Sequence, residues 1–101
     1  MANWTDEEIT VLVTIYMNND FSIGDDARPE NHLIASSFGR KPGAIDRQWR
    51  NVKDVFCGKL TANVGRKIKE TVYRYQEDPE VVENLARYYC EKKGWPLNDL
   101  L

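Results

Sequence analysis

Residues 39–56 carry the pattern that most constrains the fold of this chain: a turn containing Gly and Pro, followed by one apolar stripe. The spacing of the stripe predicts an amphipathic helix from about Pro42 to Phe56 that buries one face. The stripe consists of Ile45, Trp49, Val52 and Phe56. The opposite face carries Arg47, Arg50, Asn51 and Asp54, with Lys53 at its edge.

Two helices are predicted before this stretch. Thr5 and Glu8 form a capping box for a helix from about Asp6 to Asn18, which has a wide apolar face. A second helix begins at Pro29, which is tolerated in a first turn, and ends at Gly39. We expect its inner face to consist of Leu33, Ile34, Ser37 and Phe38. In the intervening loop, Phe21 and Ile23 are expected to lie against the core.

Two more helices are predicted after it. Ile68, Val72 and Tyr75 have helical spacing, although residues 71–75 alone also fit an extended strand. We favour the helix because the sequence offers no second strand for pairing. Asp78-Pro79 begins the last helix and Gly94 ends it, and residues 95–101 are expected to fold back as a tail.

These elements predict one all-α domain spanning residues 1–101. With 42% apolar residues in 101, the chain has enough apolar side chains for one modest core. The helices on either side of Gly39 are separated by a turn short enough for a helix-turn-helix. We therefore expect a three-helix helix-turn-helix core over residues 4–57, extended by a basic segment and a C-terminal helix over residues 58–101.

Several other classes of protein are disfavoured by the sequence. No apolar run approaches the length of about 20 residues that a membrane span needs. The N-terminus lacks the features of a signal peptide, which favours a cytoplasmic location. The lone His32 and the two cysteines, Cys57 and Cys90, have no metal-ligand spacing, and no nucleophile or phosphate-loop motif is present. We expect no enzymatic activity, no cofactor and no metal.

The charges are distributed unevenly along the chain. The net charge is −2, yet residues 40–74 contain ten basic and three acidic residues, a local net charge of +7. Residues 1–39 carry −6 and residues 75–101 carry −3. A basic segment between acidic flanks is typical of a local nucleic-acid footprint. The alternative is that these cations pair with the flanking acids on a solvated surface.

The positions of several residues resemble a known family. The Trp-Thr-Asp-Glu-Glu helix start and the later Gly-Arg turn with its Arg-Gln-Trp-Arg-Asn helix are similar to the first and third helices of Myb/SANT-like domains. The order of elements most resembles the DNA-binding domain that precedes the nuclease in bacterial and phage HNH endonuclease-like proteins. The resemblance covers roughly residues 3–90 and is carried by residues 4–8, Tyr16, Pro29-Glu30, Gly39-Arg40, Asn51, Asn63 and residues 72–75.

The resemblance implies an all-α module that contacts DNA through its third helix. Two departures accompany it. The middle tryptophan of a Myb repeat is absent, so that Phe38 or Phe21 would fill its volume, and one histidine cannot supply the metal site of an HNH nuclease.

The leading functional hypothesis is that the chain binds double-stranded DNA as a small transcriptional or phage regulatory factor. Arginine can pair with guanine and asparagine with adenine through two groups at matching spacing. The predicted base contacts are Arg47, Arg50 and Asn51. The predicted phosphate contacts are Arg40, Lys41, Lys53, Arg66, Lys67 and Lys69. Asp54 would repel the DNA backbone unless it accepts from a cytosine amine or pairs with Arg50. Since one unit of this size binds DNA weakly, we also expect a homodimer or another protein as partner.

The alternative hypothesis is a protein-interaction module, such as a phage regulator or anti-defence protein that binds a host protein. Two sets of side chains favour it. One is acidic: Asp6, Glu7, Glu8, Asp20, Asp25 and Asp26. The other is aromatic, a type enriched at interfaces, although most of its members are expected to pack in the core: Tyr73, Tyr75, Tyr88, Tyr89 and Trp95.

Overall fold

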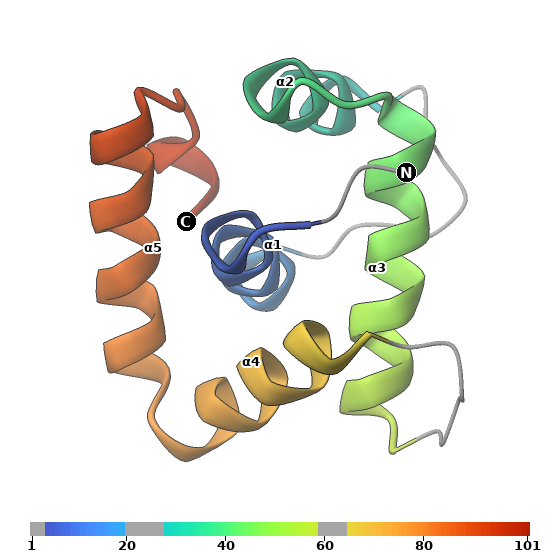
Figure 1. Cartoon of the computed structure of the whole chain (residues 1–101), viewed down its shortest axis with the longest axis vertical. Helices are drawn as coiled ribbons and strands as arrows, with labels where there is room; N and C mark the ends of the chain where they lie inside the picture. Colours follow the sequence, from blue (N-terminus) through green and yellow to red (C-terminus); the bar gives the residue numbers. More distant parts are fainter. Residues whose placement is uncertain (1–3, 20–27, 59–64) are drawn as a thin grey trace.

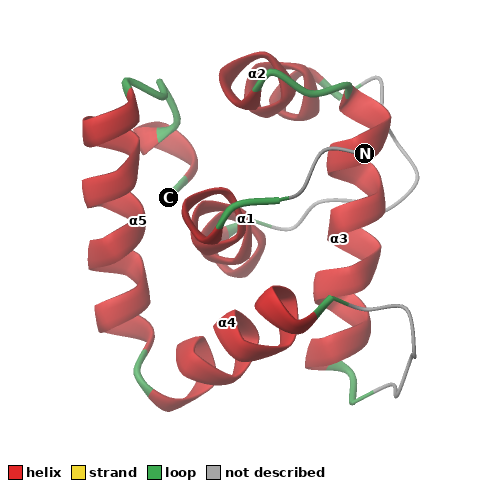
Figure 2. Ribbon diagram, viewed as in Figure 1, coloured by secondary structure: helices red, strands yellow, loops and turns green. Residues whose placement is uncertain are grey.

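Five α-helices make up most of the chain in the computed structural model, which describes residues 4–19, 28–58 and 65–101. They are α1 (Asp6–Asn18), α2 (Pro29–Phe38), α3 (Pro42–Phe56), α4 (Arg66–Glu77) and α5 (Pro79–Lys93), followed by a 3-10 helix, η1 (Asn98–Leu100). Figure 2 shows no strand in these ranges. The all-α prediction is therefore confirmed, and the ambiguous residues 66–75 are helical. Phe21, Ile23 and Asn63 lie outside the described residues.

Local sequence signals account for the helix ends. The predicted capping box is present at α1, where the Glu8 amide donates to the Thr5 hydroxyl and the Thr5 amide donates to the Glu8 carboxylate. Asp78 accepts from the Val81 amide at the start of α5. Gly39 ends α2 with a φ of 69°, a left-handed conformation that glycine adopts without a steric penalty.

Helix α1 lies at the centre of the fold. In Figure 1 it is viewed nearly end-on, with the other four helices arranged around it. It packs against α3, α4 and α5, while α2 packs against α3. All residues from Glu8 to Ile15 are buried, because α3, α4 and α5 pack against different sides of this helix. A helix with apolar side chains on several sides is stable only when it is enclosed in this way.

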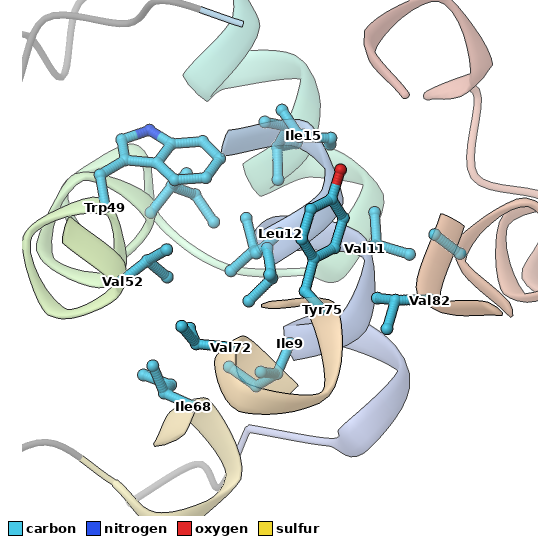
Figure 3. Close-up of a cluster of buried hydrophobic side chains, with 14 of the residues drawn as sticks. Ile9, Val11, Leu12, Ile15, Trp49, Val52, Ile68, Val72, Tyr75 and Val82 are labelled. Carbon is cyan, nitrogen blue, oxygen red and sulfur yellow. The ribbon is translucent and has the colours of Figure 1, made fainter. Parts of the chain in front are cut away.

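The core joins side chains from all five α-helices (Figure 3). Helix α1 contributes Leu12 and Ile15, and α3 contributes Trp49 and Val52. Each of these four side chains is fully buried. Around them lie further buried side chains of α2, α4 and α5: Ile34, Ile68, Val72, Tyr75, Val82 and Ala86. The C-terminal tail folds back onto this core as predicted, since Leu97 is fully buried.

The buried face of α2 differs from the predicted one. Leu33 is exposed, whereas Asn31, Ile34 and Ala35 are buried. The Asn31 side-chain oxygen accepts a hydrogen bond of 2.8 Å from the Trp49 indole nitrogen. This bond satisfies two polar groups that would otherwise be costly to bury, and it allows a polar residue to face the core in place of Leu33.

No helix in the described parts of the chain is long and apolar enough to cross a membrane.

Candidate nucleic-acid interface

The apolar stripe of α3 anchors this helix to the rest of the molecule. Ile45, Trp49 and Val52 are fully buried, and Phe56 is half-buried with its ring 5.9 Å from that of Tyr16. Together with the Asn31–Trp49 hydrogen bond, these contacts determine the rotation of α3 about its own axis. The opposite face of α3 is therefore directed toward solvent.

Three predicted contact residues of α3 are accessible on the surface. Arg47, Arg50 and Lys53 are exposed, while Asn51 and Asp54 are half-buried. Asn51 lies toward α4, and its amide nitrogen donates to the Gln48 side-chain oxygen at 3.0 Å. The guanidinium of Arg50 lies 3.7 Å from the buried carboxylate of Asp46, one turn earlier. The predicted alternative of an Arg50–Asp54 pair is thus replaced by an Arg50–Asp46 pair.

The turn before α3 is held by an ion pair between distant parts of the chain. The Arg40 guanidinium donates to both carboxylate oxygens of Glu8, with distances of 2.8 and 2.9 Å. It also lies 3.9 Å from the centre of the Trp4 ring. The side chains of Arg40 and Glu8 are only 13% and 7% exposed. Arg40 therefore links α1 to the α2–α3 turn, whereas Lys41 beside it is exposed.

The protonation of this pair reflects its surroundings. Burial alone would raise the pKa of Glu8, but hydrogen bonds from Arg40 and Thr5 and the positive charge of Arg40 outweigh burial and lower it. The hydrogen bond to Glu8 raises the pKa of Arg40. Both directions favour the charged forms, so the ion pair persists at neutral pH.

The basic residues at the start of α4 lie beside α3, because these two helices pack together. Arg66 and Lys67 are exposed, and Lys69 is half-buried. Arg66 forms a surface ion pair of 2.7 Å with Glu70. The Lys67 ammonium donates to the Trp4 carbonyl oxygen at 2.7 Å, which attaches the segment preceding α1 to α4. The start of α4 thus brings exposed cations beside α3.

A groove of about 480 Å³ lies in this region. It is lined by Trp4 and Ile9, by Gln48 and Asn51 of α3, and by residues 65–68 at the start of α4. Gln48 is only 9% exposed, although its side chain is polar. Apart from Asn51, the predicted α3 contacts do not line this groove, and Arg66 and Lys67 border it from the opposite side.

Sequence reasoning did not identify Trp4 and Gln48 as part of a candidate site. A signal for Gln48 exists, since it precedes Trp49 on the buried side of the predicted helix. A polar side chain at such a position must find a partner or face a polar groove. Trp4 gave no comparable signal, because its place beside α4 depends on a contact between residues 63 positions apart.

The acidic and aromatic sets are only partly accessible. Glu8 is paired with Arg40, and a Glu7 oxygen lies 3.9 Å from the Lys93 nitrogen. Asp20, Asp25 and Asp26 lie outside the described residues. Tyr75, Tyr89 and Trp95 pack in or against the core, as expected for most of the aromatic set. Tyr73 and Tyr88 are 53% and 56% exposed.

The thiol groups and potential metal ligands suggest no further site. Cys57 is exposed and Cys90 buried, and both are free thiols. Burial raises the pKa of Cys90 to about 11, so this thiol stays protonated at neutral pH. Within residues 4–19, 28–58 and 65–101, no group of three or more His, Cys, Asp or Glu side chains is arranged to hold a metal ion.

Comparison of the chain with protein-family models, curated proteins and solved structures gave no significant match.

Proposed function

We propose that this protein binds double-stranded DNA, with α2, the turn and α3 acting as a Myb-like helix-turn-helix. One observation carries the proposal: α3 is anchored by a fully buried stripe and presents Arg47 and Arg50 to solvent directly after a three-residue turn. An α-helix with exposed arginines fits the width of the major groove of DNA. The exposed cations at the start of α4 extend the positive surface beside it.

Base recognition is assigned to α3. Arg47 and Arg50 can each donate two parallel hydrogen bonds to a guanine edge. Asn51 lies at the border of this face, where its remaining amide N–H and its carbonyl oxygen suit an adenine edge. The Arg50–Asp46 contact of 3.7 Å involves a mostly exposed guanidinium, so DNA can compete for it.

Phosphate contacts are assigned to the accessible lysines and to Arg66. Lys41 precedes α3 and Lys53 lies in its last turn, while Arg66, Lys67 and Lys69 belong to the neighbouring helix. Arg40 is given a different role from the predicted phosphate contact. Because its guanidinium is held by Glu8 and Trp4, Arg40 positions the turn that leads into α3.

The test is fluorescence anisotropy of the full chain with random and selected duplex pools at several salt concentrations. We expect saturable binding that weakens steeply as salt increases, because cations that neutralise phosphates release counterions. The variant Arg47→Ala/Arg50→Ala should lose most of this affinity. The control variant Arg74→Ala/Arg87→Ala removes the same charge from exposed positions on α4 and α5 and should retain binding.

Absence of binding at low salt would refute the proposal. Equal losses in the two double variants would instead show a general charge effect and would refute α3 as the reading helix. Sedimentation of the protein alone and with DNA tests the expected dimer or tethering partner, because a strict monomer that binds tightly as a single unit would contradict it.

A protein partner is the second candidate function, and the exposed rings of Tyr73 and Tyr88 favour it. Tyrosine is enriched at protein interfaces because it combines a large apolar surface with a polar group. If duplex DNA does not bind, pull-downs comparing the wild-type chain with Tyr73→Ser/Tyr88→Ser test this candidate. Loss of a captured partner in that variant supports it, and capture of the same partners by both chains refutes it.

A further inference from the structure

We propose that the groove between α3 and α4 binds one nucleotide unit, with the base between Trp4 and the Gln48–Asn51 amides and the phosphate at Arg66 and Lys67. The unit can be a free nucleoside monophosphate or an unpaired nucleotide of a strand. This site goes beyond the proposed duplex binding and does not require α3 to enter a major groove. Three features of the groove carry the inference.

The first feature is an amide pair with unused hydrogen-bonding groups. The Asn51 nitrogen donates to the Gln48 oxygen at 3.0 Å. Within the described residues, the Gln48 nitrogen donates to no protein group and the Asn51 oxygen accepts from none. Gln48 is 9% exposed and lines the groove, so its nitrogen and the Asn51 oxygen are accessible there to a ligand or water. They offer a donor next to an acceptor, which matches the edge of a nucleobase.

The second feature is the apolar part of the lining, which consists of Trp4, Ile9 and Ile68. Ile9 and Ile68 are almost fully buried, and the Lys67–Trp4 hydrogen bond of 2.7 Å holds Trp4 beside α4. The flat faces of a base are apolar and pack favourably against such side chains. A volume of about 480 Å³ lies within the range of about 300–1,000 Å³ that is typical of small-molecule sites.

The third feature is positive charge at one end of the groove. Arg66 and Lys67 begin α4, and Gly65 before them provides no side-chain cap. As at any helix start, the amides of the first turn have no carbonyl partner within the helix, and here no side chain caps them. The helix dipole adds positive potential. Arg66 uses one donor in its bond to Glu70, and Lys67 uses one in its bond to the Trp4 carbonyl. The other N–H groups of both side chains can reach a phosphate. The charge complements a phosphate, and the neighbouring apolar lining complements the attached base.

The experiment is an NMR titration of the full, isotope-labelled chain with adenosine monophosphate. We expect saturable shifts at the side-chain amides of Gln48 and Asn51 and at the backbone amides of residues 65–68. Adenosine, ribose 5-phosphate and inorganic phosphate each lack part of the ligand, and each should bind at least about tenfold more weakly. No groove shifts at millimolar adenosine monophosphate, or equal affinity for inorganic phosphate, would overturn the proposal.

Two variants test the location of the site. Gln48→Leu keeps the side-chain volume and removes the amide, whereas Arg66→Gln removes the charge. Each should weaken nucleotide binding by about fivefold or more, while Arg74→Gln on the far part of α4 should not. If Gln48→Leu proves unfolded by its spectrum, Arg66→Gln alone decides. Unchanged affinity in the folded groove variants would overturn the assignment.

Two further comparisons identify the source of the ligand and distinguish nucleotide binding in the groove from duplex binding by α3. A short single strand that binds more tightly than adenosine monophosphate identifies a strand as the source, whereas weaker binding identifies the free nucleotide. The variant Arg47→Ala/Arg50→Ala should retain nucleotide binding, since neither arginine lines the groove. This variant therefore separates the two proposals, whereas Asn51, Arg66 and Lys67 are shared by both sites.

Discussion

Helices α1 and α3 have similar lengths but use their side chains in opposite ways. In α1 every residue from Glu8 to Ile15 is buried, and its neighbours α3, α4 and α5 enclose it. In α3 a narrow stripe around Trp49 is buried, while Arg47 and Arg50 remain exposed. The helix that holds this fold together is therefore not the helix that presents Arg47 and Arg50 to solvent. Changes in α1 should act on stability, and changes on the outer face of α3 should act on binding.

The largest expected effect is on the α1 side of this comparison. Leu12→Ala removes a fully buried side chain that is surrounded by the core, so the surrounding helices cannot all close the cavity. We expect a loss of about 2–5 kcal/mol in the free energy of unfolding, measured by urea denaturation. Met17→Ala in the same helix is the control, because Met17 is partly exposed and should lose less. Equal losses would contradict the central position of α1.

The next effect tests the link between the two helices. Arg40→Leu removes one partner of a largely buried ion pair and leaves the Glu8 carboxylate without its main donor. We expect a loss of about 2–4 kcal/mol in the free energy of unfolding. Adding Glu8→Gln to Arg40→Leu should recover part of this loss, because no unpaired charge then remains. If the loss in the double variant equals the sum of the losses in Arg40→Leu alone and Glu8→Gln alone, the two residues do not interact.

A smaller effect is expected from pH. Glu8 has a lowered pKa in the folded protein, so protonation favours the unfolded chain. The contribution of Glu8 to stability is complete above the ordinary carboxyl pKa of 4.5 and is lost as the pH falls through the lower folded-state value. Chemical denaturation at a series of acidic pH values measures this loss, which should be reduced in Glu8→Gln. Identical pH profiles for the two proteins would contradict the shift.

The smallest effect on stability is expected on the outer face of α3. Arg47→Ala removes an exposed side chain and should change the free energy of unfolding by no more than about 0.5 kcal/mol. The same variant should weaken duplex binding if the proposed function is correct. A large loss of stability would remove the distinction between the two helices, because the binding defect would then have a structural origin.

Much of the secondary structure could be predicted because its causes are local. The capping box at Thr5, the proline starts of α2, α3 and α5, and the glycine ends of α2 and α5 each act within a few residues. The burial of Ile45, Trp49 and Val52 likewise follows from their spacing on one helix. The error at Leu33 has a nonlocal cause, since Asn31 faces the core only because Trp49 supplies its partner.

The candidate site was less predictable than the fold. The exposure of Arg47 and Arg50 follows from the opposite side of the helical pattern. The pairing of Arg40 could not be predicted, because an arginine in a basic turn gives no sign of a carboxylate 32 residues earlier. The groove beside α4 was also not predicted, because it forms only where Trp4, Gln48 and the start of α4 meet.

Local sequence signals are sufficient to predict that this chain is helical, where α1, α2, α3 and α5 begin and end, and which side of α3 is charged. These properties depend on backbone capping and on side-chain spacing within single helices. Three other properties become visible only in the folded molecule: α1 is the enclosed helix, Arg40 supports the turn, and α3 and α4 share a groove. Those properties depend on contacts between residues far apart in sequence, and such contacts form only when all the apolar faces are buried together.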